Sequence, residues 1–308
     1  MKRILTTWLF LLLLVSLAAC QTTTVSEYSL TLLVPVGSPQ LATIQLKQQP
    51  HRYTIDYVNG PDPLVAGFLS KTYDAILAPT NLGAKLYQSG SEYTLAAVVG
   101  FGNLYIVSKD TSLPSMNDLN GTEIILFGQN QTGDIIVQYL LKEFNINATI
   151  TYVDSVQTAQ SMLIADQSKI ILTAEPSLSA LIAQLGELSI LDLQDAYQQQ
   201  SGNLSYPQVG LFVKKTTDSM AISQLLTDLN ESITWANEQP TLAAEAAVSL
   251  NFSFSKTVME TAIPRSHLQF VLANTIIDDI EQYFQLIVAT NPNLLNLPLP
   301  NNDFYYEP

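Results

Sequence analysis

The chain has 308 residues and a formal net charge of −14 at pH 7, from 13 lysines and arginines against 27 aspartates and glutamates. This length predicts two domains of roughly 100–150 residues each. Hydrophobic residues make up 47% and charged residues 13%, which excludes an intrinsically disordered chain. The basic residues are scattered, so we expect no nucleic-acid partner, because phosphate binding needs a basic stripe.

The first 19 residues have the pattern of a signal peptide. Two basic residues precede an apolar run over 4–17, which at about 1.5 Å per residue is too short for a ~30 Å hydrocarbon core. Small residues then precede Cys20, the only cysteine, in a pattern that resembles the bacterial lipobox. The resemblance implies cleavage after residue 19 and lipid, such as palmitate, on Cys20. The alternative is an ordinary secretory signal with a chance cysteine.

These features predict where the protein resides. The polar segment 20–27 has no periodicity and is predicted to be a lipidated tether. We therefore expect a bacterial protein on the extracytoplasmic face of the cell membrane, anchored there through Cys20.

Short apolar runs alternate with helical spacing from residue 28 onward. Nearly continuous apolar strands of this kind are typical of a mostly parallel sheet covered by helices on both faces. The predicted strands are 28–36, 53–58, 74–78, 93–99 and 103–108, and the predicted helices are 39–48, 64–69 and 82–88.

A second set of the same kind follows. Its predicted strands are 123–127, 148–153, 169–174 and 189–193, and its predicted helices are 134–144, 156–165 and 178–185. A strand over 209–214 and helices over 220–237, 241–250 and 267–290 complete the pattern, before an extended tail.

The sequence thus predicts an α/β protein of two lobes. Lobe one comprises residues 28–107 plus 209–308, and lobe two comprises residues 108–208. The chain crosses between them near 105–109 and 206–214, and two such crossings permit one lobe to close on the other around a ligand.

Small or polar residues follow most of the predicted strands. Ligands of open α/β sheets bind outside the carboxyl ends of the strands, where N–H groups of helix starts also point. The ligand-binding residues predicted in these turns are Gly37, Ser38, Asn59, Thr80, Asn81, Asn103, Gln129 and Thr132. Glu175 is a candidate partner for an amine or ring N–H, and Arg265 for an anion, although either residue also fits a structural role.

The sequence contains few of the residue patterns that catalysis or metal binding requires. The two histidines, His51 and His267, are far apart, and a single cysteine allows neither a disulfide nor a cysteine-based zinc site. There is no G-x-S-x-G motif, and the glycine-bounded segment 128–133 lacks the Gly-Lys-Ser/Thr ending of a phosphate loop. We expect no catalytic residue, no metal and no cofactor.

Five stretches carry a resemblance to a known family. They are LVPVGSP (33–39), YDAILAPTNLGAKLY (73–87), FGQ (127–129), AEP (174–176) and IPRS (263–266). Together they resemble the solute-binding lipoproteins of ABC importers, in the group that binds nitrate, sulfonates, taurine and thiamine precursors. D-A-x-x-A-P-T-N is the most specific part. The resemblance implies the type II periplasmic-binding-protein fold, with cleft positions at Gly37, Ser38, Thr80, Asn81, Gln129 and Thr132.

The resemblance also implies a function. We expect a monomer that captures a small-molecule solute and delivers it to an ABC permease, and not an enzyme. An enzyme on the same scaffold, similar to the pyrimidine-precursor synthases, and a ligand-sensing lipoprotein are the alternatives. The solute stays open among sulfonates, pyrimidines, nitrate and other small molecules, because the sequence supplies few basic residues.

Overall fold

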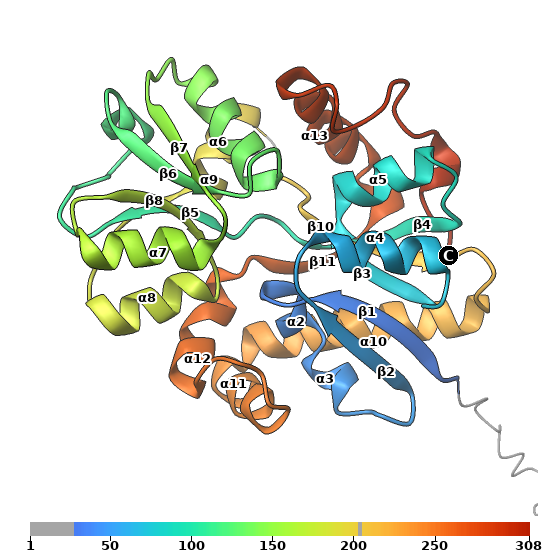
Figure 1. Ribbon diagram of the computed structural model, residues 1–308. Helices are drawn as coiled ribbons and strands as arrows, with labels where there is room; N and C mark the ends of the chain where they lie inside the picture. Colours follow the sequence, from blue (N-terminus) through green and yellow to red (C-terminus); the bar gives the residue numbers. More distant parts are fainter. Residues whose placement is uncertain (1–27, 203–204) are drawn as a thin grey trace, which may run out of the picture.

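The computed structural model of the protein describes residues 28–202 and 205–308 (Figure 1). The predicted signal peptide, the lipidated Cys20 and the tether all lie outside these residues. Among the helices that the structure describes, none combines the length and the apolar character needed to cross a membrane.

Two β-sheets form the framework. The six strands of the first sheet lie in the order β11-β4-β10-β3-β1-β2, and the five strands of the second in the order β7-β6-β8-β5-β9. We call the first sheet with its helices lobe one and the second with its helices lobe two. The strands of lobe one are β1 (Leu30–Pro35), β2 (Tyr53–Val58), β3 (Ala75–Pro79), β4 (Tyr93–Gly100), β10 (Val209–Lys214) and β11 (Leu268–Leu272). Those of lobe two are β5 (Leu104–Ser108), β6 (Glu123–Phe127), β7 (Thr149–Val153), β8 (Ile170–Ala174) and β9 (Ser189–Asp192).

Helices cover both faces of the first sheet. Leu32 and Val34 of β1 belong to one buried cluster with residues of α10, whereas Leu33 belongs to another cluster with Phe68 of α4. Side chains of a strand alternate between faces, so β1 is buried on both, which explains its unbroken apolar sequence. The helices of lobe one are α2 (Ser38–Ala42), α3 (Ile44–Lys47), α4 (Pro61–Ser70), α5 (Thr80–Gln88), α10 (Ser219–Glu238), α11 (Pro240–Ser249), α12 (Lys256–Arg265) and α13 (Ile277–Thr290).

The second sheet is covered in the same way. Ile124 and Leu126 of β6 lie in a cluster with Ile136 of α6, while Ile125 lies in another cluster with Leu163 of α7. The helices of lobe two are α6 (Thr132–Glu143), α7 (Val156–Ala165), α8 (Ser177–Leu185) and α9 (Leu193–Ser201). Three short 3₁₀ turns complete the described elements, at Met116–Leu119, Ala273–Thr275 and Asn302–Phe304.

The predicted α/β class with two sheets is confirmed, and the sheets are mixed rather than mostly parallel. Parallel pairs join β1 to β2 and β3, and β6 to β7 and β8. The strands that begin after a crossing, β10 and β5, run antiparallel to both of their neighbours. They return from the other lobe and so enter their sheets from the opposite end.

The crossings also refine the predicted division of the chain. The first runs through residues 101–103, and β5 already pairs with β8 and β9 of lobe two. Residues 104–107, which the sequence analysis assigned to lobe one, therefore belong to the second sheet. The apolar composition of β4 and β5 could not show where one sheet ends, because both strands are fully buried.

The predicted helices need correction at three places. The helix predicted over 267–290 begins only at α13, because Leu268–Leu272 forms β11 on the edge of the first sheet, paired with β4. The helices α9 and α12 have no counterpart in the prediction, and the sequence of α9, LQDAYQQQS, is largely polar. The start of α9 is fixed by Asp192, whose carboxylate accepts hydrogen bonds from the N–H groups of Gln194 and Asp195.

One buried cluster runs from lobe to lobe. It includes Leu33 and Phe212 of lobe one, Leu126 and Tyr197 of lobe two, and Tyr283 of α13. In Figure 1 α13 lies above the space between the lobes, near α6. The lobes thus share apolar packing on one side of the crossings.

Candidate functional site

A cavity of about 440 Å³ lies between the two lobes. It is lined by the turns that follow β1, β2 and β3 in lobe one and β6 and β8 in lobe two. These turns lie at the carboxyl ends of their strands, which is where open α/β sheets bind ligands. Its volume lies within the range of roughly 300–1,000 Å³ that is usual for small-molecule sites.

Six of the ten predicted ligand-binding residues line this cavity. They are Gly37, Ser38, Asn81, Asn103, Thr132 and Glu175. The structure places their side chains or backbone around one space, although they come from positions up to 138 residues apart in the chain. Their role toward a ligand stays a prediction.

The other four predicted residues do not line the cavity. Thr80 is fully buried, and its hydroxyl donates to the Pro207 carbonyl oxygen at 2.6 Å, so it fastens the second crossing to α5. Asn59 is followed by Gly60 and Pro61, which take the lining positions instead, and Gln129 is followed in the same way by Asn130 and Gln131. The fourth, Arg265, ends α12.

A hydrogen-bond chain joins the lobes at one wall of the cavity. Asn103 Nδ2 donates to Ser38 Oγ at 2.6 Å, and Ser38 Oγ donates to the Glu175 carbonyl oxygen at 3.1 Å. All three residues are buried. Asn103 has φ +119°, a backbone region that residues other than glycine rarely adopt, and strain of this kind concentrates at functional sites. The chain holds lobe one, the first crossing and lobe two in register around the cavity.

Glu175 is the buried carboxyl group of the cavity. Its oxygens accept hydrogen bonds from the backbone N–H of Ser179 at 3.1 Å and from the Ser179 hydroxyl at 2.9 Å, so the carboxyl caps the start of α8. Burial raises its pKa from 4.5 to about 7, and the two Ser179 hydrogen bonds and the positive charge of Arg265 only partly offset this. The group is therefore poised near neutral pH.

Gly102 and Gln194 fix the first crossing. Gly102 has φ +101°, and a Cβ atom there would lie 2.2 Å from Gln194 Cγ. The Gln194 side-chain oxygen accepts from the Leu104 N–H at 2.9 Å and from the Tyr206 hydroxyl at 2.5 Å. One buried amide thus ties both crossings together, and only glycine leaves room for it.

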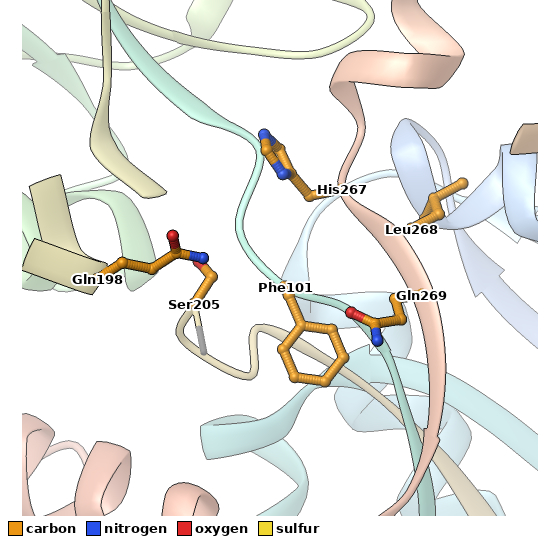
Figure 2. Close-up of a pocket in the computed structure, with 6 residues that line it drawn as sticks. All are labelled: Phe101, Gln198, Ser205, His267, Leu268 and Gln269. Atoms are coloured by element: carbon orange, nitrogen blue, oxygen red, sulfur yellow. The ribbon is translucent and has the colours of Figure 1, made fainter. Parts of the chain in front are cut away.

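A second, smaller pocket of about 300 Å³ adjoins the crossings. Figure 2 shows Gln198 and Ser205 on one side of it and His267 and Gln269 on the other, with the Phe101 ring between them. The His267 ring also meets lobe two, through its Nε2 atom at 2.9 Å from the Tyr105 hydroxyl and 3.6 Å from Asp192 Oδ2. The Tyr105 hydroxyl donates a hydrogen bond to the Arg265 carbonyl oxygen at 2.6 Å. These contacts connect the two lobes on this side.

The structure also brings residues to the main cavity that the sequence analysis missed. They include Lys85, Phe127, Gln208 and Leu294. Gln208 follows Pro207 on the second crossing, and a polar residue next to a proline just before a strand was its only signal. Leu294 lies after α13, and nothing in the sequence of the tail indicates that it returns to the cleft.

The described residues offer few groups for metal binding or catalysis. Among the residues that the structure describes, no group of three or more His, Cys, Asp or Glu side chains is placed to hold a metal ion. The ionisable side chains in the described lining of the main cavity are Lys85 and Glu175.

Comparisons with known proteins agree with this geometry. No family model matches the chain, and no curated protein matches its sequence. Solved structures do. An ABC transporter protein from Parabacteroides distasonis is 20% identical with a TM-score of 0.81, covering 91% of this chain and 99% of that one. The periplasmic aliphatic sulphonate binding protein of Escherichia coli is 14% identical with a TM-score of 0.70, covering 92% and 93%.

A third similar structure is the ligand binding component of an ABC-type import system from Staphylococcus aureus, with zinc bound. It is 16% identical with a TM-score of 0.69, and the match covers 92% of this chain and 97% of that one. These likenesses extend over nearly all of the described residues. The chain has the fold of the periplasmic binding proteins, as the resemblance noted in its sequence implies.

Proposed function

We propose that the protein is the solute-binding component of an ABC importer. The observation that carries the proposal is the 440 Å³ cavity, which is built jointly by turns of both lobes of a periplasmic-binding-protein fold. A cavity built from both lobes closes around its ligand when the lobes approach and releases it when they separate. In this proposal the closed, loaded form is the one that a membrane permease recognises.

The proposed cellular arrangement follows from the N-terminal sequence. Cleavage before Cys20 and lipid attachment to that residue would hold the protein at the outer face of the cell membrane, with residues 20–27 as a tether. A protein held at the surface delivers its solute to a permease in the same membrane without diffusing away. Mass spectrometry of the mature N-terminal peptide tests this part, and a peptide that starts upstream of Cys20 would contradict it.

Binding is supported over catalysis by the state of the ionisable groups at the cavity. Both oxygens of Glu175 are engaged by Ser179, and the Lys85 ammonium donates to the Asn293 carbonyl oxygen at 3.0 Å. General acid–base or nucleophilic catalysis needs a reactive group within hydrogen-bonding reach of a partner that activates it. The Ser179 hydroxyl beside Glu175 is itself buried and lies outside the cavity lining, and Lys85 is bonded to a backbone carbonyl oxygen, so neither side chain has such a partner facing the cavity.

The decisive experiment is native mass spectrometry of the full chain carrying Cys20→Ser, before and after mild unfolding and refolding. A small molecule bound before and lost after refolding is the expected result. The variant Asn81→Ala should retain less of the molecule, because Asn81 lines the cavity, and it should leave the melting temperature unchanged. If no small molecule co-purifies and a broad thermal-shift screen finds none that stabilises the protein, the proposal fails.

A further inference from the structure

The chemistry of the cleft indicates which class of solute it takes, provided that the proposed binding function holds. An anion such as a sulfonate needs cationic side chains or free N–H groups of helix starts. The cavity lining contains one basic residue among those described, Lys85, which is half-exposed and bonded to the Asn293 carbonyl oxygen. Arg265 lies outside the lining.

Proline occupies the helix starts on the lobe-one side of the cavity. Pro39 is the second residue of α2 and Pro61 is the first residue of α4, and both prolines line the cavity. Proline has no backbone N–H, so each of these two starts has one donor fewer to offer a ligand. At the third start, that of α5, the Thr80 N–H already donates to the Gln208 carbonyl oxygen at 3.0 Å.

On the lobe-two side, a buried acidic residue stands at the start of each helix. Asp134, in the first turn of α6, is 1% exposed and accepts hydrogen bonds from the Asn130 N–H at 2.8 Å and from the Tyr152 hydroxyl at 2.7 Å. Glu175 plays the same part at α8 through its bonds from Ser179. An acidic side chain thus already occupies the positive end of each of these two helix dipoles, which makes both helix starts less favourable for an anionic ligand.

Uncharged carboxamides provide most of the polar lining. The amide nitrogen of Asn103 donates to Ser38, which fixes the direction of the side chain, and its Oδ1 is buried without a hydrogen-bond partner in the described part of the chain. Oδ1 of Asn81 and Oε1 of Gln208, two other lining residues, are in the same situation. Buried oxygens without partners favour a ligand that donates hydrogen bonds.

The remaining wall is apolar. Its side chains come from both lobes and from the tail after α13, so a ligand would contact them on more than one side. They include Val36, Leu64, Leu82, Leu104, Phe127 and Leu294. A surface of this kind favours a ligand with an apolar body.

We infer that the cleft selects an uncharged, hydrogen-bond-donating molecule with an apolar face, such as an amide-bearing or amino-bearing ring, and that it discriminates against sulfonates and other oxyanions. The prolines and the buried acids reduce the donors and the positive potential that an anion needs. The carboxamide oxygens supply the acceptors that a neutral donor needs.

Matched probes of equal size test the inference. Isothermal titration calorimetry of the full chain carrying Cys20→Ser compares benzenesulfonamide with benzenesulfonate, and nicotinamide with nicotinate, each at millimolar concentration. Within each pair the shape is almost the same and only the charge and the donor differ. We expect the uncharged member of each pair to bind at least about tenfold more tightly than the anion.

The outcomes separate the inference from the proposed function. Equal or tighter binding of either anion overturns the inference and leaves solute binding standing. Absence of binding by all four probes overturns the inference, and the co-purification experiment then decides the proposed function separately.

Two variants test whether the preference for the uncharged probe arises in the cavity. Asn103→Gly removes the amide while tolerating the φ of +119°. It should reduce the preference for benzenesulfonamide, measured as its affinity divided by that of benzenesulfonate, by about threefold or more. Asn117→Gly, at an exposed position outside the cavity, is the control and should leave the ratio unchanged. A merely structural role of Asn103 would lower the melting temperature and leave the ratio as it is, which would contradict the inference.

Discussion

Replacing Glu175 by glutamine should make the protein's stability depend less on pH. In the unfolded chain this carboxyl group loses its proton near pH 4.5, whereas burial in the folded protein raises its pKa to about 7. Between these values the folded state binds more protons than the unfolded state, so the free energy of unfolding falls as the pH rises. Each pKa unit corresponds to about 1.4 kcal/mol, so Glu175 lowers the stability by about 3 kcal/mol between pH 4 and pH 8.

Glutamine is neutral throughout this range and keeps one oxygen for the Ser179 N–H. At pH 4 we expect Glu175→Gln to be less stable than the wild type by about 1 kcal/mol, since one acceptor for Ser179 is lost. At pH 8 the order should reverse, with the variant more stable by about 2 kcal/mol, because the penalty of a buried charge is gone.

Urea unfolding at the two pH values measures this difference. Glu187→Gln, an exposed position just beyond the C-terminal end of α8, is the matched control and should change the stability by less than about 0.5 kcal/mol at either pH. If the difference between the wild type and Glu175→Gln is the same at pH 4 and pH 8, the carboxyl does not titrate as its burial implies, and the reasoning about this site is wrong.

Three further substitutions test other parts of the structure. In Gly83→Ala the new Cβ would lie 2.0 Å from the buried Phe212 ring, so overpacking of about 1–3 kcal/mol should exceed the gain in helix propensity, and a more stable variant in urea would contradict this. Thr80→Val removes the bond to the Pro207 carbonyl oxygen and should lower the free energy of unfolding by about 1 kcal/mol, whereas a neutral result would mean that water replaces the hydroxyl. Tyr105→Phe removes a bond between the lobes and should weaken solute binding in calorimetry about two- to fivefold, although Tyr105 does not line the cavity; unchanged affinity would show that this contact does not support the closed form.

The local pattern of the sequence determined most of the elements and the fold class. Strands that are buried on both faces must be apolar throughout, which makes runs such as Glu123–Phe127 and Val209–Lys214 visible without a structure. Turns at the strand ends need small or polar residues, so Gly37, Ser38 and Asn81 also stand out. These signals depend on neighbouring residues only.

Tertiary structure decided everything that depends on contacts across the chain. The sequence of Leu268–Leu272 is compatible with helix, and it becomes a strand because the edge of β4 offers backbone partners. The hydroxyl of Thr80 and the amide of Asn81 are neighbours of similar chemistry, yet the fold turns one to a carbonyl oxygen of the second crossing and the other to the cavity. Which polar side chain faces a ligand is fixed by packing between lobes, and no local pattern carries that information.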